Sequence, residues 1–172
     1  MSSKAASKKP SLKKSLPKKS SPKKASLKAP SLRQLQKQLV GTWRLISAED
    51  RNSPTDPWVP YTFGNPPSGY FIYDATGHAS VQIMTTPPQK ISEPESQNPT
   101  PSEALAVFEN YISYYGTYTV DETNITVQVE GAWDPRQVGT PQPRPYKLSG
   151  DTLIIGDRVT YKRTLKRVKQ II

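Results

Sequence analysis

Two segments of the chain alternate between apolar and other residues with a period of two, and this pattern limits the possible folds strongly. Residues 68–84 and 117–130 each contain two such runs, joined by the turn-like tetrapeptides Asp-Ala-Thr-Gly (74–77) and Asp-Glu-Thr-Asn (121–124). Because successive side chains of a strand point to opposite faces, each segment is predicted to be a β-hairpin. The chain is therefore expected to be mainly β and antiparallel.

The faces of the first hairpin depend on which residues pair across its turn. We predict Tyr73 opposite His78. One face then carries Tyr70, Ile72, Ala79, Val81 and Ile83, and the other carries Phe71, Tyr73, His78, Ser80, Gln82 and Met84. The sequence does not decide which face lines the core. If the mixed face is inside, His78, Ser80 and Gln82 would orient a ligand, and His78 would exchange protons near neutral pH. Otherwise His78 is a half-exposed residue beside a turn.

The second hairpin separates its residues more clearly. Its apolar face consists of Tyr118, Val120, Ile125, Val127 and Val129, and its other face is polar. This is typical of a sheet with one face on the core and one in water.

Residues 1–30 differ in composition from the rest of the chain. They hold ten lysines and no acidic residue, among serines and prolines, while the remainder has 14 basic and 14 acidic residues. The net charge of +10 therefore belongs to this segment. We predict a disordered tail over residues 1–30 and one folded domain over residues 31–172. The tail is either a solvated extension or a segment that contacts polyanions, either nucleic acid or an anionic membrane surface.

Several classes of site and of location are excluded by composition. The chain has no cysteine and one histidine, so it offers no disulfide, thiolate site or multi-histidine metal site. We expect no metal and no cofactor. No apolar run approaches the length of a transmembrane helix, and residues 1–30 lack the apolar region of a secretory signal. We expect a cytoplasmic protein, with organelle targeting or nucleoid or nuclear association as alternatives.

Helices are predicted at two places before the last strands. Thr100 as N-cap, Pro101 at the first position and Glu103 at the third predict a helix that ends near residues 113–116. Its apolar stripe is expected to pack on the domain. Leucines spaced by three and four residues predict a short helical turn over residues 32–39.

Proline content and alternation predict the structure of the remaining segments. Five prolines between residues 51 and 69 predict a long loop, with one short strand near residues 58–59. Residues 158–163 are expected to form the last strand. A short helix is expected from residue 162 to the end.

The segment that begins with Gly41, Thr42 and Trp43 resembles the opening signature of lipocalin and calycin barrels. Further segments match the small lipocalin-like domain family in order, and they lie at residues 39–45, 68–73, 76–82, 114–120, 129–131, 139–144 and 150–153. The resemblance implies an up-and-down antiparallel barrel of about eight strands with one short helix. Such a barrel has room for side chains or one small ligand.

The resemblance also implies roles for individual residues. Gly41 and Trp43 would close one end of the barrel, where Trp43 is a plug and a late arginine, Arg163 or Arg158, stacks across it. The long first loop would cover the open mouth with Trp58, Tyr61 and Phe63. The ligand-binding residues expected toward that mouth are Trp58, Tyr70, Tyr73, His78, Gln82, Tyr118 and Trp133.

Three functions are compatible with these features. The first is binding of a small, mostly apolar molecule in the barrel, with the tail contacting polyanions. The second is a cofactor-free isomerase or cyclase, with His78 as its catalytic acid or base. The third is a nucleic-acid-associated protein that works through residues 1–30. Because the sequence has no nucleotide loop, metal cluster or nucleophile motif, binding is favoured over catalysis.

Overall fold

The computed structural model describes Met1, residues 31–92 and residues 98–169. The tail that was predicted to be disordered, residues 1–30, lies outside the described residues except for Met1. The boundary between tail and domain therefore stays a prediction.

In the described residues, nine strands form one antiparallel sheet. From β3 to β9 each strand pairs with the next, while β1 pairs with β3 and, at its end, with the two-residue strand β2. β1 also pairs with β9, and this pairing closes the sheet into a barrel of eight strands. The strands are β1 (Gly41–Asp50), β2 (Val59–Pro60), β3 (Ser68–Tyr73), β4 (His78–Met84), β5 (Tyr111–Val120), β6 (Asn124–Ala132), β7 (Pro141–Ser149), β8 (Thr152–Ile155) and β9 (Tyr161–Arg167). The predicted fold class is confirmed.

The second hairpin has the predicted division into an apolar and a polar face. Val120 pairs with Ile125 and Tyr118 pairs with Val127, so the apolar side chains of β5 and β6 meet on one face. Tyr118, Ile125 and Val127 are buried. Here the turn chemistry was sufficient, because Asp121 accepts hydrogen bonds from two backbone N–H groups of its own turn.

The first hairpin is shifted by one residue from the predicted register. Tyr73 pairs with Ala79, not with His78, and Phe71 pairs with Val81. The turn is held by Asp74, whose side chain accepts from the backbone N–H groups of Thr76 and His78. Because a shift of one residue exchanges the faces of a strand, the buried face of β3 becomes Phe71 and Tyr73.

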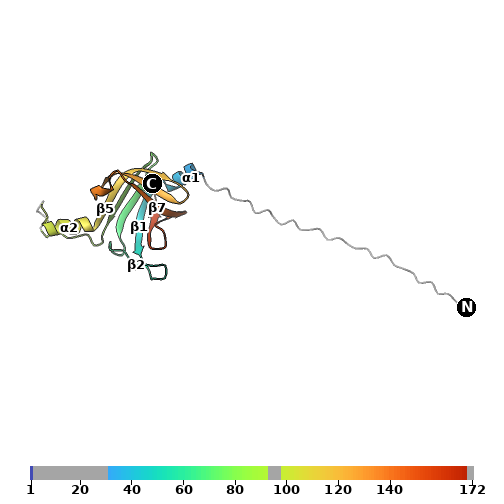
Figure 1. Ribbon diagram of the computed structural model, residues 1–172, viewed down its shortest axis with the longest axis horizontal. Helices are drawn as coiled ribbons and strands as arrows, with labels where there is room; N and C mark the ends of the chain where they lie inside the picture. The colour runs from blue at the N-terminus through green and yellow to red at the C-terminus, as the bar shows by residue number, and fades with distance from the viewer. Residues whose placement is uncertain (2–30, 93–97, 170–172) are drawn as a thin grey trace.

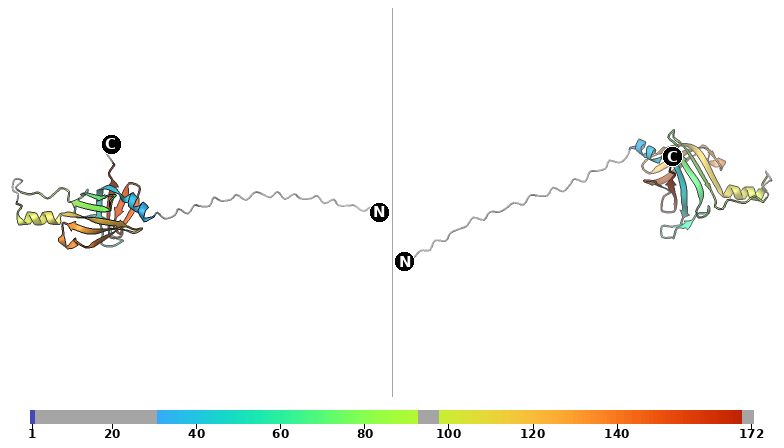
Figure 2. Two further views of the ribbon diagram at one scale, coloured as in Figure 1. Left: turned by 90° about the horizontal axis from the view of Figure 1, so that it is seen from above. Right: turned by 180° about the vertical axis from the view of Figure 1, so that it is seen from behind.

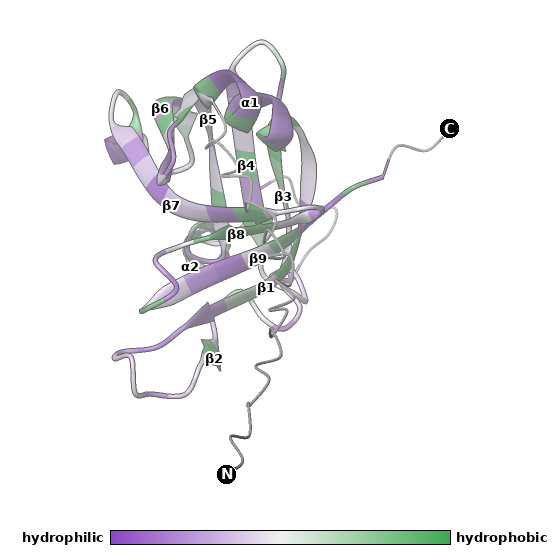
Figure 3. Cartoon of the chain, turned by 90° about the vertical axis from the view of Figure 1, so that its right-hand side faces the viewer, coloured by the Kyte–Doolittle hydropathy of each residue, from purple (hydrophilic) through white to green (hydrophobic). Residues whose placement is uncertain are grey.

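The inward-facing side chains form one hydrophobic core. It consists of Leu39, Trp43, Leu45, Phe63, Phe71, Tyr73, Ala79, Val81, Ile83, Tyr114, Tyr118, Ile125, Val127, Val129, Leu153, Ile155 and Leu165. Hydrophobic and hydrophilic residues alternate along the strands in Figure 3, as expected when one face is buried.

The described residues form two α-helices, which lie on opposite sides of the barrel (Figures 1 and 2), and one 3-10 helix, Pro135–Gln137. α1 (Leu32–Leu39) has the predicted bounds, and Ser31 and Gln34 form its capping box. α2 (Pro101–Glu109) begins as predicted, at Thr100 as N-cap with Pro101 and Glu103 behind it. Its predicted end at residues 113–116 is wrong, because β5 already starts at Tyr111 and pairs there with the end of β4.

α2 also differs from prediction in its packing. None of its residues is buried, and Leu105, Val107 and Phe108 are exposed. The helix extends away from the barrel (Figure 1). Its N-terminus is fixed through Glu103, whose pKa is lowered to about 2 by hydrogen bonds from the Ser92 hydroxyl, the Ser92 N–H and the N-cap Thr100.

The end of the chain is a strand where a helix was expected. β9 continues to Arg167, because residues 161–167 pair with β1 and residues 163–166 also pair with β8. The expected helix over residues 162–172 is therefore wrong up to Arg167. Residues 170–172 lie outside the described part.

Candidate functional site

The barrel end next to α1 is closed by Trp43. This side chain is fully buried, and its Nε1–H donates to the carbonyl oxygen of Leu39 at 2.8 Å. Tyr73 and Tyr118 pack edge-to-face in the same core, with ring centres 5.2 Å apart. Trp43 is thus enclosed by protein, in keeping with its predicted structural role.

The arginine that stacks on Trp43 is Arg167, and the predicted assignment to Arg163 is corrected. The guanidinium carbon of Arg167 lies 4.1 Å from the centre of the Trp43 ring. Arg167 comes from the end of β9 and reaches this end of the barrel, because it pairs with Trp43 across the β1–β9 seam. Arg163 lies four residues earlier, where β9 faces the far end of β1.

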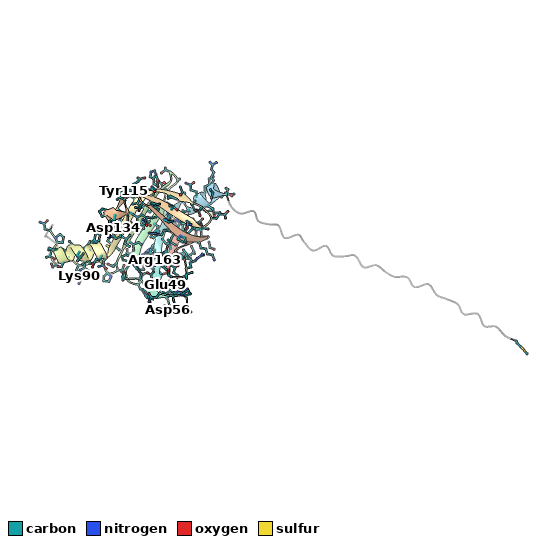
Figure 4. All side chains as sticks on the ribbon, in the orientation of Figure 1. Glu49, Asp56, Lys90, Tyr115, Asp134 and Arg163 are labelled. Carbon is teal, nitrogen blue, oxygen red and sulfur yellow. The ribbon has the colours of Figure 1, made fainter. Side chains whose placement is uncertain are left out.

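Arg163 is instead held at that far end. Its Nη1 donates to Asp50 Oδ1 at 2.5 Å and to the carbonyl oxygen of Glu49 at 3.1 Å. Its guanidinium also lies over the Tyr61 ring, at 4.5 Å from the ring centre. Arg163 and Glu49 are labelled in Figure 4, on the adjacent strands β9 and β1.

A cavity of about 360 Å³ lies in the barrel interior. Its wall is formed by Phe71, Val81, Ile83, Ile112, Tyr114, Arg144, Ile155, Tyr161 and Arg163. These residues come from β3, β4, β5, β7, β8 and β9, so the cavity is surrounded by most of the barrel. The volume is within the range of small-molecule pockets, which runs from about 300 to 1,000 Å³.

The cavity wall is apolar on one side and polar on the other. Phe71, Val81 and Ile83 form a continuous apolar surface across β3 and β4. The polar groups are the hydroxyls of Tyr114 and Tyr161 and the guanidinium groups of Arg144 and Arg163. An arrangement of this kind binds a molecule with an apolar body and fixes its orientation through a few polar contacts.

The buried tyrosines are held in the protonated state near neutral pH. Burial raises the pKa of Tyr114, an effect that the nearby charge and hydrogen bond of Arg144 partly offset. Burial also raises the pKa of Tyr73, and the neighbouring Tyr114 and Tyr118 raise it further. These hydroxyls therefore serve as hydrogen-bonding groups and not as bases at neutral pH.

The long loop after β1 covers part of the mouth. Phe63 is buried in the core, and Tyr61 packs beside it with ring centres 4.8 Å apart. Trp58 lies farther out, between Arg51 and Lys162, with each cation 4.3 Å from its ring centre. Trp58 thus fastens the loop to β9 and is not among the residues that line the cavity.

Tyr70, His78 and Gln82 lie on the outer face of the barrel. All three are exposed, because the shifted register turns Tyr70 outward and the buried residues of β4 are Ala79, Val81 and Ile83. The Thr76 hydroxyl lies 2.8 Å from His78 Nδ1 at the turn. Of the two orientations that the sequence left open, the structure has the one in which His78 and Gln82 point outward.

The other residues expected near a ligand are also not among those that line the cavity. Tyr73 and Tyr118 face inward, and the Tyr118 hydroxyl donates to the carbonyl oxygen of Asp74. Trp133 stacks on Phe108 of α2, with ring centres 5.7 Å apart, and donates through Nε1 to the Phe108 carbonyl. The contact of these seven expected residues with a ligand remains a prediction.

Arg144 and Tyr161 are cavity residues that the sequence reasoning missed. Arg144 lies in β7, where prolines occupy positions 141, 143 and 145. Because proline lacks a backbone N–H and is uncommon inside a strand, this composition does not by itself predict β7. Prolines with a period of two leave the intervening residues on one face, and Arg144 lies opposite the buried Ile125.

The described residues offer neither a membrane-spanning helix nor a metal cluster. No helix in residues 31–92 or 98–169 is long and apolar enough to cross a membrane. Over the same part of the chain, no group of three or more histidine, aspartate or glutamate side chains is placed to hold a metal ion.

A closed antiparallel barrel with a tryptophan-plugged end and an internal cavity defines a lipocalin-like protein. Residues 40–170 match the family model described as the lipocalin-like domain, and the chain belongs to this family. The resemblance inferred from the sequence is thereby confirmed. A search of curated proteins finds no match.

A comparison with solved structures gives matches of low identity and low TM-score. One is an uncharacterized protein from Bacteroides eggerthii DSM 20697, at 10% identity and a TM-score of 0.40, with 75% of this chain and 98% of that chain covered. Another is a single-residue mutant of the fluorescent protein UnaG, at 13% identity and a TM-score of 0.33, with 78% and 99% covered. At these scores, neither bears on ligand or activity.

Proposed function

We propose that this protein binds a small, mostly apolar molecule inside its barrel. The observation that carries the proposal is the cavity of about 360 Å³ with its apolar wall and few polar groups. A family of barrels whose interiors hold small ligands is consistent with this use of the space.

Catalysis in the cavity has less support. His78, the residue considered as acid or base, is exposed on the outer face and does not line the cavity. The buried tyrosines have raised pKa values, which makes them poor bases at neutral pH. A binding module therefore accounts for the geometry better than an isomerase or cyclase.

The test uses N-phenyl-1-naphthylamine, a neutral dye whose fluorescence rises in apolar surroundings, with the full chain. We expect saturable binding that is lost in Ile83→Phe, because the larger side chain fills part of the cavity. Ile72→Phe is the matched control, since Ile72 is 40% exposed on the outer face. Binding that is equal in both variants, with both folded by circular dichroism, would show that the dye binds elsewhere and would refute the proposal.

A role for the tail is a separate proposal, which rests on the ten lysines of residues 1–30. Lysines that meet phosphates release counterions, so DNA binding through the tail would weaken steeply with salt. Deletion of residues 1–30 is expected to abolish such binding in a filter or fluorescence-anisotropy assay. Unchanged DNA affinity at moderate salt after the deletion would rule this role out.

A further inference from the structure

One charged group in the cavity wall has no counter-charge among the described residues. Arg144 is half-buried, and its Nη2 donates to Gln142 Oε1 at 2.9 Å, while Nη1 donates to the Pro143 carbonyl at 3.2 Å. Tyr114 lines the same cavity, and the nearby charge of Arg144 acts to lower the pKa of its hydroxyl. Among residues 31–92 and 98–169, no carboxylate pairs with it.

The second arginine in the cavity wall, Arg163, has its charge balanced by a carboxylate. Arg163 has a side chain only 14% exposed, and it pairs with Asp50. The partners of Arg144 in the described part of the chain are neutral, although a guanidinium in an apolar cavity is stabilised chiefly by an anion. Its charge is therefore available to a molecule that enters the cavity.

Arg144 lies in β7 and lines the cavity. The strand holds prolines on either side of Arg144, at positions 143 and 145, which restrict the backbone. Arg144 lies opposite Ile125, so its side chain starts from the inner face. Arg144 and the apolar surface of Phe71, Val81 and Ile83 line the same cavity.

We propose that the barrel selects small apolar molecules that carry one acidic group, a carboxylate or sulfonate. Arg144 binds that group, and the Tyr114 hydroxyl assists. The inference rests on the proposed ligand-binding function and adds the chemical class of the ligand. An apolar body packs on the β3–β4 wall, while the anion supplies the counter-charge that the described residues do not.

The test compares two dyes with the same aromatic body. 1-Anilinonaphthalene-8-sulfonate carries an anion, and N-phenyl-1-naphthylamine lacks it. We expect Arg144→Gln to weaken the sulfonate dye by roughly 10- to 100-fold, the usual effect of a lost hydrogen bond to a charged group. The affinity for the neutral dye should change by less than about threefold, and Arg144→Lys should retain part of the sulfonate affinity.

Controls separate the possible failures. Arg44→Gln, on the exposed outer face of β1, should affect neither dye. Tyr114→Phe provides a second test of the same contact if Arg144→Gln proves unfolded by circular dichroism, and it should weaken only the sulfonate dye. Equal affinities of the two dyes for wild-type protein, or equal losses for both dyes in the Arg144 variant, would overturn the acid-group inference alone. Failure of both dyes to bind would overturn the proposed function with it.

Discussion

Replacement of Arg167 by glutamine is expected to loosen the closed end of the barrel. The guanidinium lies over the Trp43 ring, and it donates to the carbonyl oxygens of Val40 at 2.7 Å and Gln38 at 2.6 Å. These carbonyls lie at the end of α1, where helix groups lack internal partners. Arg167 thus joins β9, the Trp43 plug and α1 in one contact.

The magnitude follows from the contacts that are lost. A partly buried cation–π contact contributes about 0.5–2 kcal/mol, and each hydrogen bond to a carbonyl about 0.5–1.5 kcal/mol. The ion pair with Asp151 adds little, because that carboxylate is 63% exposed. We expect Arg167→Gln to lower the free energy of unfolding by roughly 2–4 kcal/mol, a large share of the stability of a small domain.

Urea denaturation followed by far-UV circular dichroism measures this change. Arg44→Gln is the control, since an exposed residue of the outer wall should change the free energy by less than about 0.5 kcal/mol. Arg167→Lys keeps the charge but not the planar fork, so it should recover less than half of the loss. A double-mutant cycle with Trp43→Phe should show a coupling of about 0.5–1.5 kcal/mol.

The reasoning would be refuted if Arg167→Gln cost less than about 0.5 kcal/mol, within the range of ordinary surface substitutions. It would also be refuted if Trp43 were coupled to Arg163 and not to Arg167. The second outcome would restore the partner that the sequence suggested. Arg163→Gln therefore belongs in the same series of variants.

Two further predictions concern β5 and α2. A Cβ on Gly116 would lie 1.9 Å from the Gln128 carbonyl oxygen, so Gly116→Ala should cost about 1–3 kcal/mol in urea denaturation. Gly131→Ala meets only the movable ring of the exposed Tyr115 and should cost less than about 1 kcal/mol; equal costs would contradict this account. Glu103, with its pKa lowered to about 2, stabilises the start of α2 fully above pH 4.5, and this contribution is lost as the pH falls toward 2. An NMR titration of the Glu103 carboxyl with a midpoint near 4.5 would be inconsistent with the hydrogen bonds that hold it.

The hairpins show why alternation predicts strands more reliably than it predicts their pairing. Period two was enough to find β3, β4, β5 and β6, because it follows from the local geometry of an extended chain. Register depends on how the turn is closed. The Asp121 turn closed as expected, but the Asp74 side chain bonds the backbone of His78, and the pairing moved by one residue.

The site was less predictable than the fold for a related reason. His78 and Gln82 were expected near a ligand because of their chemistry, yet they alternate along β4 with the buried Ala79, Val81 and Ile83 and therefore point outward. Arg144 was not among the expected site residues, and it lies in a strand with prolines at positions 141, 143 and 145. The cavity is lined by residues from six strands. A local sequence pattern does not predict which residues of different strands come together.

What the sequence determined by itself is the set of local choices. Alternation, turn residues and the Thr100–Glu103 capping box specified strands, turns and helix starts, since each depends on residues a few positions apart. Only the tertiary structure decided the closure of β1 on β9, the choice of Arg167 as the partner of Trp43 and the cavity around Arg144. These features join residues more than a hundred positions apart or on several strands, and their geometry is set by strand register and barrel closure.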